Sequence, residues 1–281
     1  EDIYWGQLPI FAGRVRGFLK IQDGCDDRCT YCIIPYARGS SRSVRMGALL
    51  GEVQRLVDQG IQEIVLTGVN IADYGKEFGI TLEDLVEGIL SHTKLPRLRL
   101  SSLDPTEISD RMLSMIEPGG RLMPHIHVSL QSAVSRVLRA MKRHYREEEV
   151  ITCLNKIYRL DPKIFVGMDM IAGFPSETRE EHEQGMLLLK DLPWTRLHVF
   201  PYSEREGTPA LKIPGSVPQQ ERKRRAQELM SLSLKRHEIF CAQYLNGEIK
   251  DVLFESPYEV AGDWYVAGHS PNYLRVLVRA P

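Results

Sequence analysis

Three cysteines, Cys25, Cys29 and Cys32, lie within eight residues of one another. Their C-x3-C-x2-C spacing lets one short loop present three thiolates, which are soft ligands suited to iron–sulfur clusters or to zinc. A cubane cluster held by three thiolates keeps one iron free to chelate a small molecule. Structural zinc nearly always takes four ligands, and no second cysteine pair or nearby histidine completes such a set. The spacing therefore favours an iron–sulfur cluster with an open iron, with zinc as the alternative.

The other two cysteines, Cys153 and Cys241, stand alone and are expected to be small buried side chains in helices. An odd count of five, three of them clustered, argues against a disulfide framework and indicates a reducing, cytoplasmic compartment. The formal net charge is −1, so no global field attracts nucleic acid or membrane, and any basic surface must be local. No apolar run approaches the roughly 18 residues of a membrane span, and no signal peptide is recognisable.

The elements that must position the cysteines alternate regularly between strand and helix. Strands are expected at 18–21, 63–67, 97–101, 125–130, 164–172 and 196–200, and helices at 47–59, 82–90, 109–116, 134–143, 146–160 and 179–192. Alternation of this kind predicts a parallel sheet covered by helices. Six units are too few for an eightfold barrel, so the expected fold is an α/β partial (β/α)6 barrel. Its binding site should lie at the carboxyl ends of the strands.

The predicted barrel occupies residues 17–216, and the sequence changes character on both sides of it. Residues 1–16 are expected to be a linker from a domain outside this sequence, because the first residue is Glu1 and not Met. A connecting segment, 217–246, contains a long charged helix predicted at 218–244. Residues 247–281 predict a small antiparallel β module that ends in mid-pattern, with strands at 249–254, 264–269 and 273–278.

The segment around the cysteines, FLKIQDGCDDRCTYCIIPYARGSSRS, resembles the radical S-adenosylmethionine (SAM) superfamily, and more narrowly its methylthiotransferases. Four more blocks agree: LTGVNIADYG at 66–75, HVSLQSAVSRVLRAMKRHY at 127–145, DMIAGFPSET at 169–178 and LHVFPYSEREGTPA at 197–210. The first and last are most similar to the enzymes that methylthiolate threonylcarbamoyl-adenosine in tRNA, next to the anticodon. The branches that act on isopentenyl-adenosine, or on an aspartate of a ribosomal protein, are the alternatives.

The resemblance implies a 4Fe-4S cluster on the three cysteines, with SAM bound to the open iron and cleaved to a 5′-deoxyadenosyl radical. It implies a methylthio group placed on C2 of the adenosine. It also implies a second cluster in an N-terminal domain that is absent from this sequence, and a C-terminal module like the RNA-binding TRAM domain. The expected partners are tRNA and a reducing donor such as flavodoxin or ferredoxin, and the protein is expected to be a monomer.

Residues that end three of the predicted strands are expected to contact SAM or substrate. Gly68 and Asn70 follow the second strand, where the superfamily contacts the SAM amino end, and Ser102 follows the third. Ordinary turn residues are the alternative interpretation. Gln131, after the fourth strand, is expected to face the open iron as the catalytic polar group, with a structural buried glutamine as the alternative. The family usually reads Gln-Ser-Gly-Ser here, but Ala133 and Val134 replace the last two residues.

Two further groups of residues complete the predicted site. Among the basic residues of 134–146, Arg143 is expected to hold the SAM carboxylate with a bidentate guanidinium, and the others to meet RNA phosphates or solvent. The adenine is expected to pack on Gly173, Phe174, Phe200 and Tyr202, which follow the last two strands. For Phe200, a place in the core is the alternative. The aromatics Tyr36, Tyr202 and Trp264 would suit base stacking. A non-enzymatic RNA-binding module stapled by a metal loop is the rival hypothesis.

Overall fold

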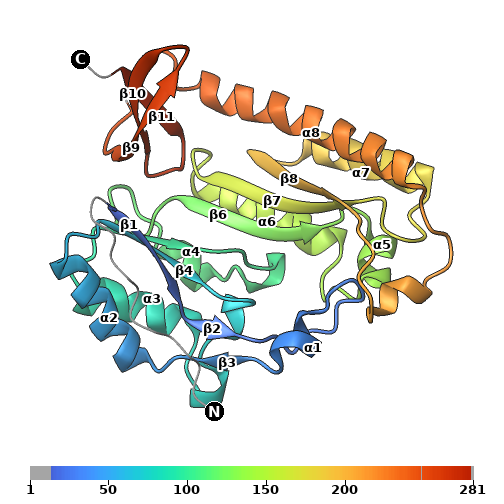
Figure 1. Cartoon of the computed structure of the whole chain (residues 1–281), viewed down its shortest axis with the longest axis horizontal. Helices are drawn as coiled ribbons and strands as arrows, with labels where there is room; N and C mark the ends of the chain where they lie inside the picture. Colours follow the sequence, from blue (N-terminus) through green and yellow to red (C-terminus); the bar gives the residue numbers. More distant parts are fainter. Residues whose placement is uncertain (1–13, 248, 280–281) are drawn as a thin grey trace.

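The computed structural model describes residues 14–247 and 249–279 (Figure 1). Six parallel strands form two sheets of three, in the orders β1-β4-β5 and β6-β7-β8. Their bounds are β1 (Arg16–Lys20), β4 (Glu63–Thr67), β5 (Arg97–Leu100), β6 (His125–Gln131), β7 (Phe165–Ala172) and β8 (Arg196–Pro201). Isolated parallel bridges, Leu98 to Leu122 and Leu103 to Val128, join β5 to the second half. The α/β partial barrel is therefore confirmed, with β1 and β8 as its open edges.

Helices connect and cover the strands, as the repeating pattern predicts. They are α1 (Ile34–Arg38), α2 (Met46–Asp58), α3 (Leu82–His92), α4 (Asp110–Ser114), α5 (Ser135–Ala140), α6 (Glu147–Leu160) and α7 (Arg179–Asp191), with 3-10 turns at Ile71–Asp73, Lys76–Phe78, Pro105–Glu107 and Pro209–Lys212. Capping boxes begin α3 at Thr81 and α7 at Thr178. A two-residue strand pair, β2 (Gln22–Asp23) with β3 (Arg42–Ser43), was not expected from the sequence.

Side chains alternate between the two faces of each barrel strand. On β6, Ile126, Val128 and Leu130 are buried in the main hydrophobic core together with residues of the helices. His127, Ser129 and Gln131 point to the opposite side and are only partly covered. This opposite side, turned away from the helices, is called the inner face below. The two-residue period of a strand separates the core from the surface that can meet a ligand.

Two predicted helices are shorter than expected. The basic helix predicted at 134–143 ends at Ala140, because Lys142 adopts a left-handed conformation with φ 57° and turns the chain. Arg143 therefore lies beyond the helix and does not share a face with Arg136 and Arg139, as the spacing had suggested. The helix predicted at 109–116 is reduced to α4, and the chain then enters the Pro118–Gly120 turn.

The chain leaves the barrel along α8 (Gln219–Ala242), which packs beside β8 and α7 (Figure 1). The last three strands, β9 (Leu253–Val260), β10 (Asp263–His269) and β11 (Arg275–Arg279), form an antiparallel sheet. The strand predicted at 249–254 is wrong in its bounds, since Asp251 has a left-handed φ of 54° and β9 begins after it. Ala261 and Gly262, both with positive φ, make the tight turn to β10. None of the helices in the described part of the chain has the length and apolar character needed to cross a membrane.

This C-terminal β module is attached at the ends of the barrel strands where those strands begin. Arg97 donates hydrogen bonds to the carbonyl oxygens of Asp251 (3.0 Å) and His269 (3.2 Å), and Arg99 to those of Pro271 (2.8 Å) and Ser270 (3.0 Å). The module lies near the start of β1, whereas α1 and the cysteine loop lie at the opposite ends of the strands (Figure 1).

Candidate active site

The cysteine loop follows β1 directly and is closed at its base by the β2–β3 pair. Gly24 has φ 77°, and a Cβ atom there would lie 2.1 Å from the carbonyl oxygen of Ser40. Only glycine fits this approach without strain. The Cys25 amide donates to the carbonyl of Gly39 at 3.1 Å. The start of the loop that carries the thiols is thus held against the segment between α1 and β3.

The far side of the loop is tied to α5 by one threonine. The Thr30 amide donates to the carbonyl of Met141 (3.1 Å), and its hydroxyl to that of Ala140 (2.9 Å). Both acceptors are orphan carbonyls at the end of a helix. The early end of α5 therefore fixes the loop between Cys29 and Cys32.

A cavity of about 170 Å³ opens beside the loop, and all three clustered cysteines line it. Its walls are Cys25, Asp27, Cys29, Tyr31, Cys32, Gly68, Val69, Asn70, Ser101, Ser102, Asp104, Glu107, Ser129, Gln131 and Arg143. Five residues predicted from sequence beside the cysteines are among them: Gly68, Asn70, Ser102, Gln131 and Arg143. Their role as contacts of SAM or substrate remains a prediction.

The cysteines are free thiols. Burial raises the pKa of Cys25 to about 12 and also raises that of Cys29. Metal ligands must be thiolates, so loading this loop would release protons. No group of three or more His, Cys, Asp or Glu side chains in residues 14–247 and 249–279 is arranged to hold a single metal ion. The thiols instead stand around the wall of the cavity.

A buried glutamine, not anticipated from the sequence, orders the turn after β4. The side-chain oxygen of Gln22 accepts hydrogen bonds from the amides of Val69 (3.0 Å) and Asn70 (2.9 Å). Its side-chain nitrogen donates to the carbonyl of Gly24 at 2.7 Å. A Cβ on Gly68 would lie 2.8 Å from the same glutamine oxygen, which explains the glycine. One amide therefore couples the cysteine loop to the turn that carries Asn70.

Gln131 ends β6 in a left-handed conformation, with φ 62°, after a register irregularity in its pairing with β7. A residue other than glycine in this region carries strain, which is common at functional sites. The two residues that depart from the family pattern, Ala133 and Val134, are buried and pack in the core. Their side chains therefore serve packing, and the polar function at this turn is left to Gln131 and Ser132.

Arg143 follows the turn at Lys142, lines the cavity, and already has hydrogen-bond and ion-pair partners there. Its guanidinium donates to the sulfur of Cys29 (3.0 Å) and to the hydroxyl of Tyr145 (3.0 Å), and it forms an ion pair with Asp104. Burial raises the pKa of Asp104 to about 7 despite the arginine. The cation lies against a predicted cluster ligand, so its predicted contact with the SAM carboxylate would have to be shared with Asp104.

The four residues predicted to hold adenine do not line this cavity. Phe174 is fully buried and packs edge-to-face on Tyr31 (6.3 Å between ring centroids) and on Tyr202 (5.5 Å). Phe200 is 55% exposed on the inner face of the edge strand β8. Since Tyr31 lies in the cavity wall, Phe174 stands one layer behind it. Tyr202 is buried under Arg222 and so is not available to stack on an RNA base.

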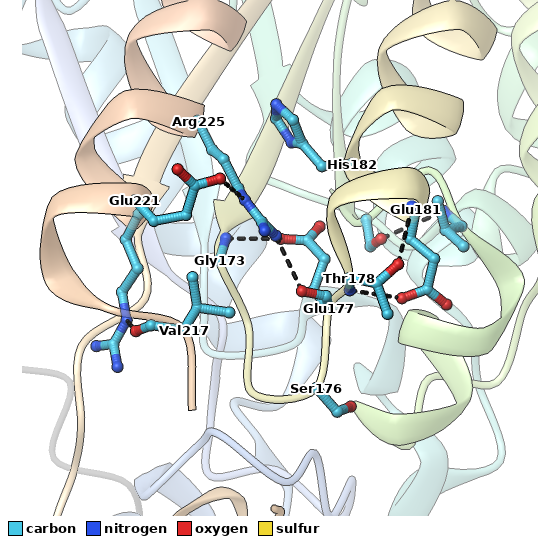
Figure 2. Close-up of polar contacts among 12 residues, drawn as sticks. Gly173, Ser176, Glu177, Thr178, Glu181, His182, Val217, Glu221 and Arg225 are labelled. Carbon is cyan, nitrogen blue, oxygen red and sulfur yellow. Dashed lines mark hydrogen bonds and ion pairs between the residues drawn. The ribbon is translucent and has the colours of Figure 1, made fainter. Parts of the chain in front are cut away.

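The Gly173 turn is locked from outside by α8, as Figure 2 shows. The buried carboxylate of Glu177 accepts from the Gly173 amide (2.8 Å) and from Arg225 (2.9 Å), and Arg225 also meets Glu221 (2.9 Å). Burial raises the pKa of Glu177, and Arg225 opposes that shift. A Cβ on Gly173, where φ is 73°, would lie 2.6 Å from the side chain of Arg222. The glycine thus allows α8 to pack directly on the turn.

Sequence reasoning missed the acidic side of the cavity, formed by Asp27, Asp104 and Glu107. A signal existed, because Asp27 lies inside the cysteine loop and Asp104 follows β5 at the carboxyl end of the strand. Together with Arg143 these carboxylates give the cavity both charges.

A family model described as "Radical SAM superfamily" matches residues 19–189, which is more than half of the chain. The chain belongs to the radical SAM superfamily. Members of this superfamily bind a 4Fe-4S cluster and SAM, and the residues present fit both. Three free thiols on one loop supply the soft donors for the cluster, and the charged cavity beside them suits a zwitterionic ligand.

Curated relatives of this radical SAM chain carry two related names. The threonylcarbamoyladenosine tRNA methylthiotransferase MtaB of Rickettsia prowazekii is 40% identical over 89% of this chain and 59% of its own length. MtaB of Bacillus subtilis is 35% identical over 97% of this chain and 61% of its own length. The tRNA-2-methylthio-N(6)-dimethylallyladenosine synthase of Bacillus subtilis is 37% identical over all of this chain and 55% of its own length. The chain thus spans little more than half of each relative.

Solved structures support the same fold at low identity. Coproporphyrinogen III oxidase (HemN) from Escherichia coli, described as a radical SAM enzyme, aligns with TM-score 0.59 at 15% identity, over 93% of this chain and 68% of that one. The radical SAM methyltransferase TsrM from Kitasatospora setae aligns with TM-score 0.57 at 17% identity, over 69% and 38% of the two chains.

Proposed function

We propose that this chain carries the radical-generating centre of an enzyme that adds a methylthio group to C2 of N6-threonylcarbamoyladenosine in tRNA, next to the anticodon. The observation that carries the proposal is the cavity in which three free thiols stand beside Gln131, Asn70 and Arg143. The relatives named MtaB support the choice of reaction and substrate.

Cys25, Cys29 and Cys32 would hold the cluster. When bound, the cluster and SAM supply a 5′-deoxyadenosyl radical, and the protein positions them and excludes water. SAM carries two cationic groups and one carboxylate. Asp104 and Glu107 offer acceptors for its amino group, and the Arg143 guanidinium offers donors for its carboxylate. Gln131, fixed by its strained backbone, is the neutral polar group that would face substrate.

The tRNA would be the macromolecular partner, and the protein would act as a cytoplasmic monomer supplied with electrons by a flavodoxin or ferredoxin. Exposed aromatics near basic groups support contact with RNA. Tyr36 is 60% exposed with the Arg28 guanidinium 5.3 Å from its ring, and Trp264 of the C-terminal module is 55% exposed. Such side chains stack on unpaired bases. The second cluster used for sulfur insertion would belong to a domain outside this sequence, so SAM cleavage is proposed for this chain and complete methylthiolation for the longer protein.

A second candidate is methylthiolation of isopentenyl-adenosine. It is favoured by the 37% identity to the dimethylallyladenosine-type synthase over the whole chain. The two candidates share the cysteine loop and SAM cavity and differ only in the substituent on N6 of the adenosine.

The radical assignment is tested by anaerobic reconstitution with iron and sulfide, followed by dithionite and SAM. We expect 5′-deoxyadenosine from the parent chain and from the control Cys241→Ala. Cys241 lies on α8, remote from the cysteine loop. Cys29→Ala should keep the far-ultraviolet spectrum of the barrel, lose iron and form no product. A fully loaded parent that forms no 5′-deoxyadenosine rejects the proposal. Unfolding of Cys29→Ala, with bound metal but no SAM binding in the parent, supports the stapled RNA-binding module.

The substrate is tested by mass analysis of tRNA nucleosides from cells that lack the full-length gene. Loss of the methylthio form of threonylcarbamoyl-adenosine alone is the expected result. Loss of the methylthio form of isopentenyl-adenosine instead selects the second candidate, and an unchanged profile rejects both.

A further inference from the structure

Three polar side chains form a cluster on the inner faces of β6, β7 and β8. The ring nitrogen Nε2 of His127 lies 3.0 Å from a carboxylate oxygen of Asp169, and the rings of His127 and His198 lie 5.1 Å apart. Asp169 and His198 are direct partners in the pairing of β7 with β8. This group is called the inner-face cluster below. None of its three residues lines the cavity of the cysteines.

The position of His127 is built into the sheet. Its partner in the register of β7 is Gly167, and a Cβ there would lie 2.9 Å from the ring nitrogen Nδ1 of His127. The glycine therefore leaves room for the imidazole to lie across β7 toward Asp169. A glycine in the middle of a strand weakens the strand, so close approach of another group is the usual reason for it.

The inner-face cluster retains hydrogen-bonding capacity. Among the described residues, Asp169 has a partner for only one carboxylate oxygen, and neither ring nitrogen of His198 has a hydrogen-bond partner. Burial, and next the neighbouring His127, lower the pKa of His198. A neutral imidazole has one donor and one acceptor nitrogen. The inner-face cluster can thus both donate hydrogen bonds to a ligand on the inner face and accept them from it.

This capacity adjoins the proposed reaction cavity. Ser129 and Gln131, the next inner-face residues after His127 on β6, line that cavity. Two residues of a strand span about 7 Å. Ser101 lines the cavity as well and also borders, with His127, the gap between β5 and β6. A purine with an extended N6 substituent is longer than this separation. A base presented to the cavity can therefore place its N6 substituent on the inner-face cluster.

We infer that His127, Asp169 and His198 receive the polar N6 substituent of the substrate adenosine and make the site selective for threonylcarbamoyl over isopentenyl. The inference rests on the proposed function. A threonylcarbamoyl group brings amide, hydroxyl and carboxylate groups that can pair with the free carboxylate oxygen and the imidazole. An isopentenyl group would cover the same polar atoms with hydrocarbon and leave them without partners. Sites built to hydrogen-bond a substrate group discriminate strongly against analogues that lack it.

The surroundings of the cluster agree with this assignment. The two open edges of the barrel present aromatic rings, Phe18 on β1 (57% exposed) and Phe200 on β8 (55% exposed), on the same inner face. Exposed rings at the entrance suit stacking of a base. Between them the inner face carries Thr67, Ser101 and the inner-face cluster, with Val65 on β4 and Ile171 on β7 as aliphatic neighbours.

The test compares three anticodon stem-loop RNAs whose adenosine carries threonylcarbamoyl, isopentenyl or no substituent. Their dissociation constants are measured by fluorescence anisotropy with the reconstituted chain and SAM. We expect the parent to bind the threonylcarbamoyl RNA at least tenfold more tightly than the isopentenyl RNA. His198→Leu and Asp169→Leu should reduce this ratio to about threefold or less, and His198→Gln should retain part of it. His92→Leu, an exposed histidine on α3, is the control and should keep the parent ratio.

Iron content and thermal midpoint identify variants that fail to fold. Gly167→Ala then serves as an independent probe, because it displaces His127 without removing a polar group. Parent selectivity that survives in folded His198→Leu and Asp169→Leu overturns the inference and leaves the proposed function intact. A parent that binds the two modified RNAs equally also overturns it. A loaded parent that binds none of the three RNAs overturns tRNA as the partner in the proposed function, whereas SAM cleavage is judged by the formation of 5′-deoxyadenosine.

Discussion

Replacing Glu63 by Gln removes the carboxylate that contacts all three members of a buried group of arginines, of which Arg16 also pairs with Glu255 at 3.1 Å. Glu63 is fully buried, and its oxygens lie 2.6 Å from Nε of Arg16, 2.9 Å from Nε of Arg97 and 2.9 Å from Nε of Arg99. Arg99 is 1% exposed, and burial lowers its pKa to about 10, so it is charged at pH 7. The substitution would leave Arg97 and Arg99 facing a neutral amide, and Arg16 with Glu255 alone.

The size of the effect follows from these distances. One pair of charges at about 3 Å attracts by about 5 kcal/mol at an effective dielectric of about 20. Most of that attraction offsets the cost of removing the charges from water, but the cost remains when one partner is lost. Breaking a buried pair by removing one partner therefore destabilises by about 3–5 kcal/mol. We expect Glu63→Gln to lower the free energy of unfolding by that amount.

Urea unfolding followed by circular dichroism measures the loss. Glu87→Gln is the control, because Glu87 pairs with Arg111 at the surface and its loss should shift the midpoint far less. Arg97 and Arg99 also hold the C-terminal module by its carbonyls, so limited proteolysis between α8 and β9 should become faster in Glu63→Gln. A loss below about 1 kcal/mol would refute the reasoning, since a surface-like pair is worth no more than that.

Three further predictions concern the site and its support. Gly24→Ala should lower the iron-to-protein ratio after reconstitution, because its Cβ would meet a backbone oxygen. The control is Gly39→Ala, where φ is 80° but the space around the Cβ is open, and it should load iron normally. Equal iron-to-protein ratios in the two variants would contradict the clash. Gln22→Leu should weaken SAM binding, measured by equilibrium dialysis, by releasing the turn of Asn70, and unaltered affinity would count against that coupling. Burial lowers the pKa of His125 well below 6.5, so the unfolded chain binds its proton first and stability is lost as pH falls below 6.5. The free energy of unfolding should therefore be lower at pH 5 than at pH 6.5, and His125→Phe should abolish this contribution in urea unfolding at the two pH values.

Several features of the site followed from residue types and spacing. The sequence predicted the cysteine loop and the six β/α units. It also predicted that strand-ending residues would lie near the cysteines, and the structure brings Gly68, Asn70 and Ser102 to the cavity that the cysteines line. Local periodicity carried that information, because parallel strands bring their carboxyl ends to one edge. The residues predicted to hold adenine lie outside this cavity, and their role stays a prediction. Phe174 and Tyr202 follow β7 and β8 as expected but pack on each other behind Tyr31.

The sequence by itself determined the three-cysteine loop and the kind of fold, since both depend on short-range patterns: cysteine spacing, strand period and helix period. Tertiary structure alone decided which distant groups meet. Arg143 reaches Cys29 because Lys142 ends α5 early, and His127 reaches Asp169 because Gly167 stands opposite it in the sheet. Such contacts depend on register, helix ends and backbone handedness, which side-chain periodicity does not encode. The loop of Cys25, Cys29 and Cys32 can be recognised in the sequence. The polar cavity wall beside it forms only when the chain folds.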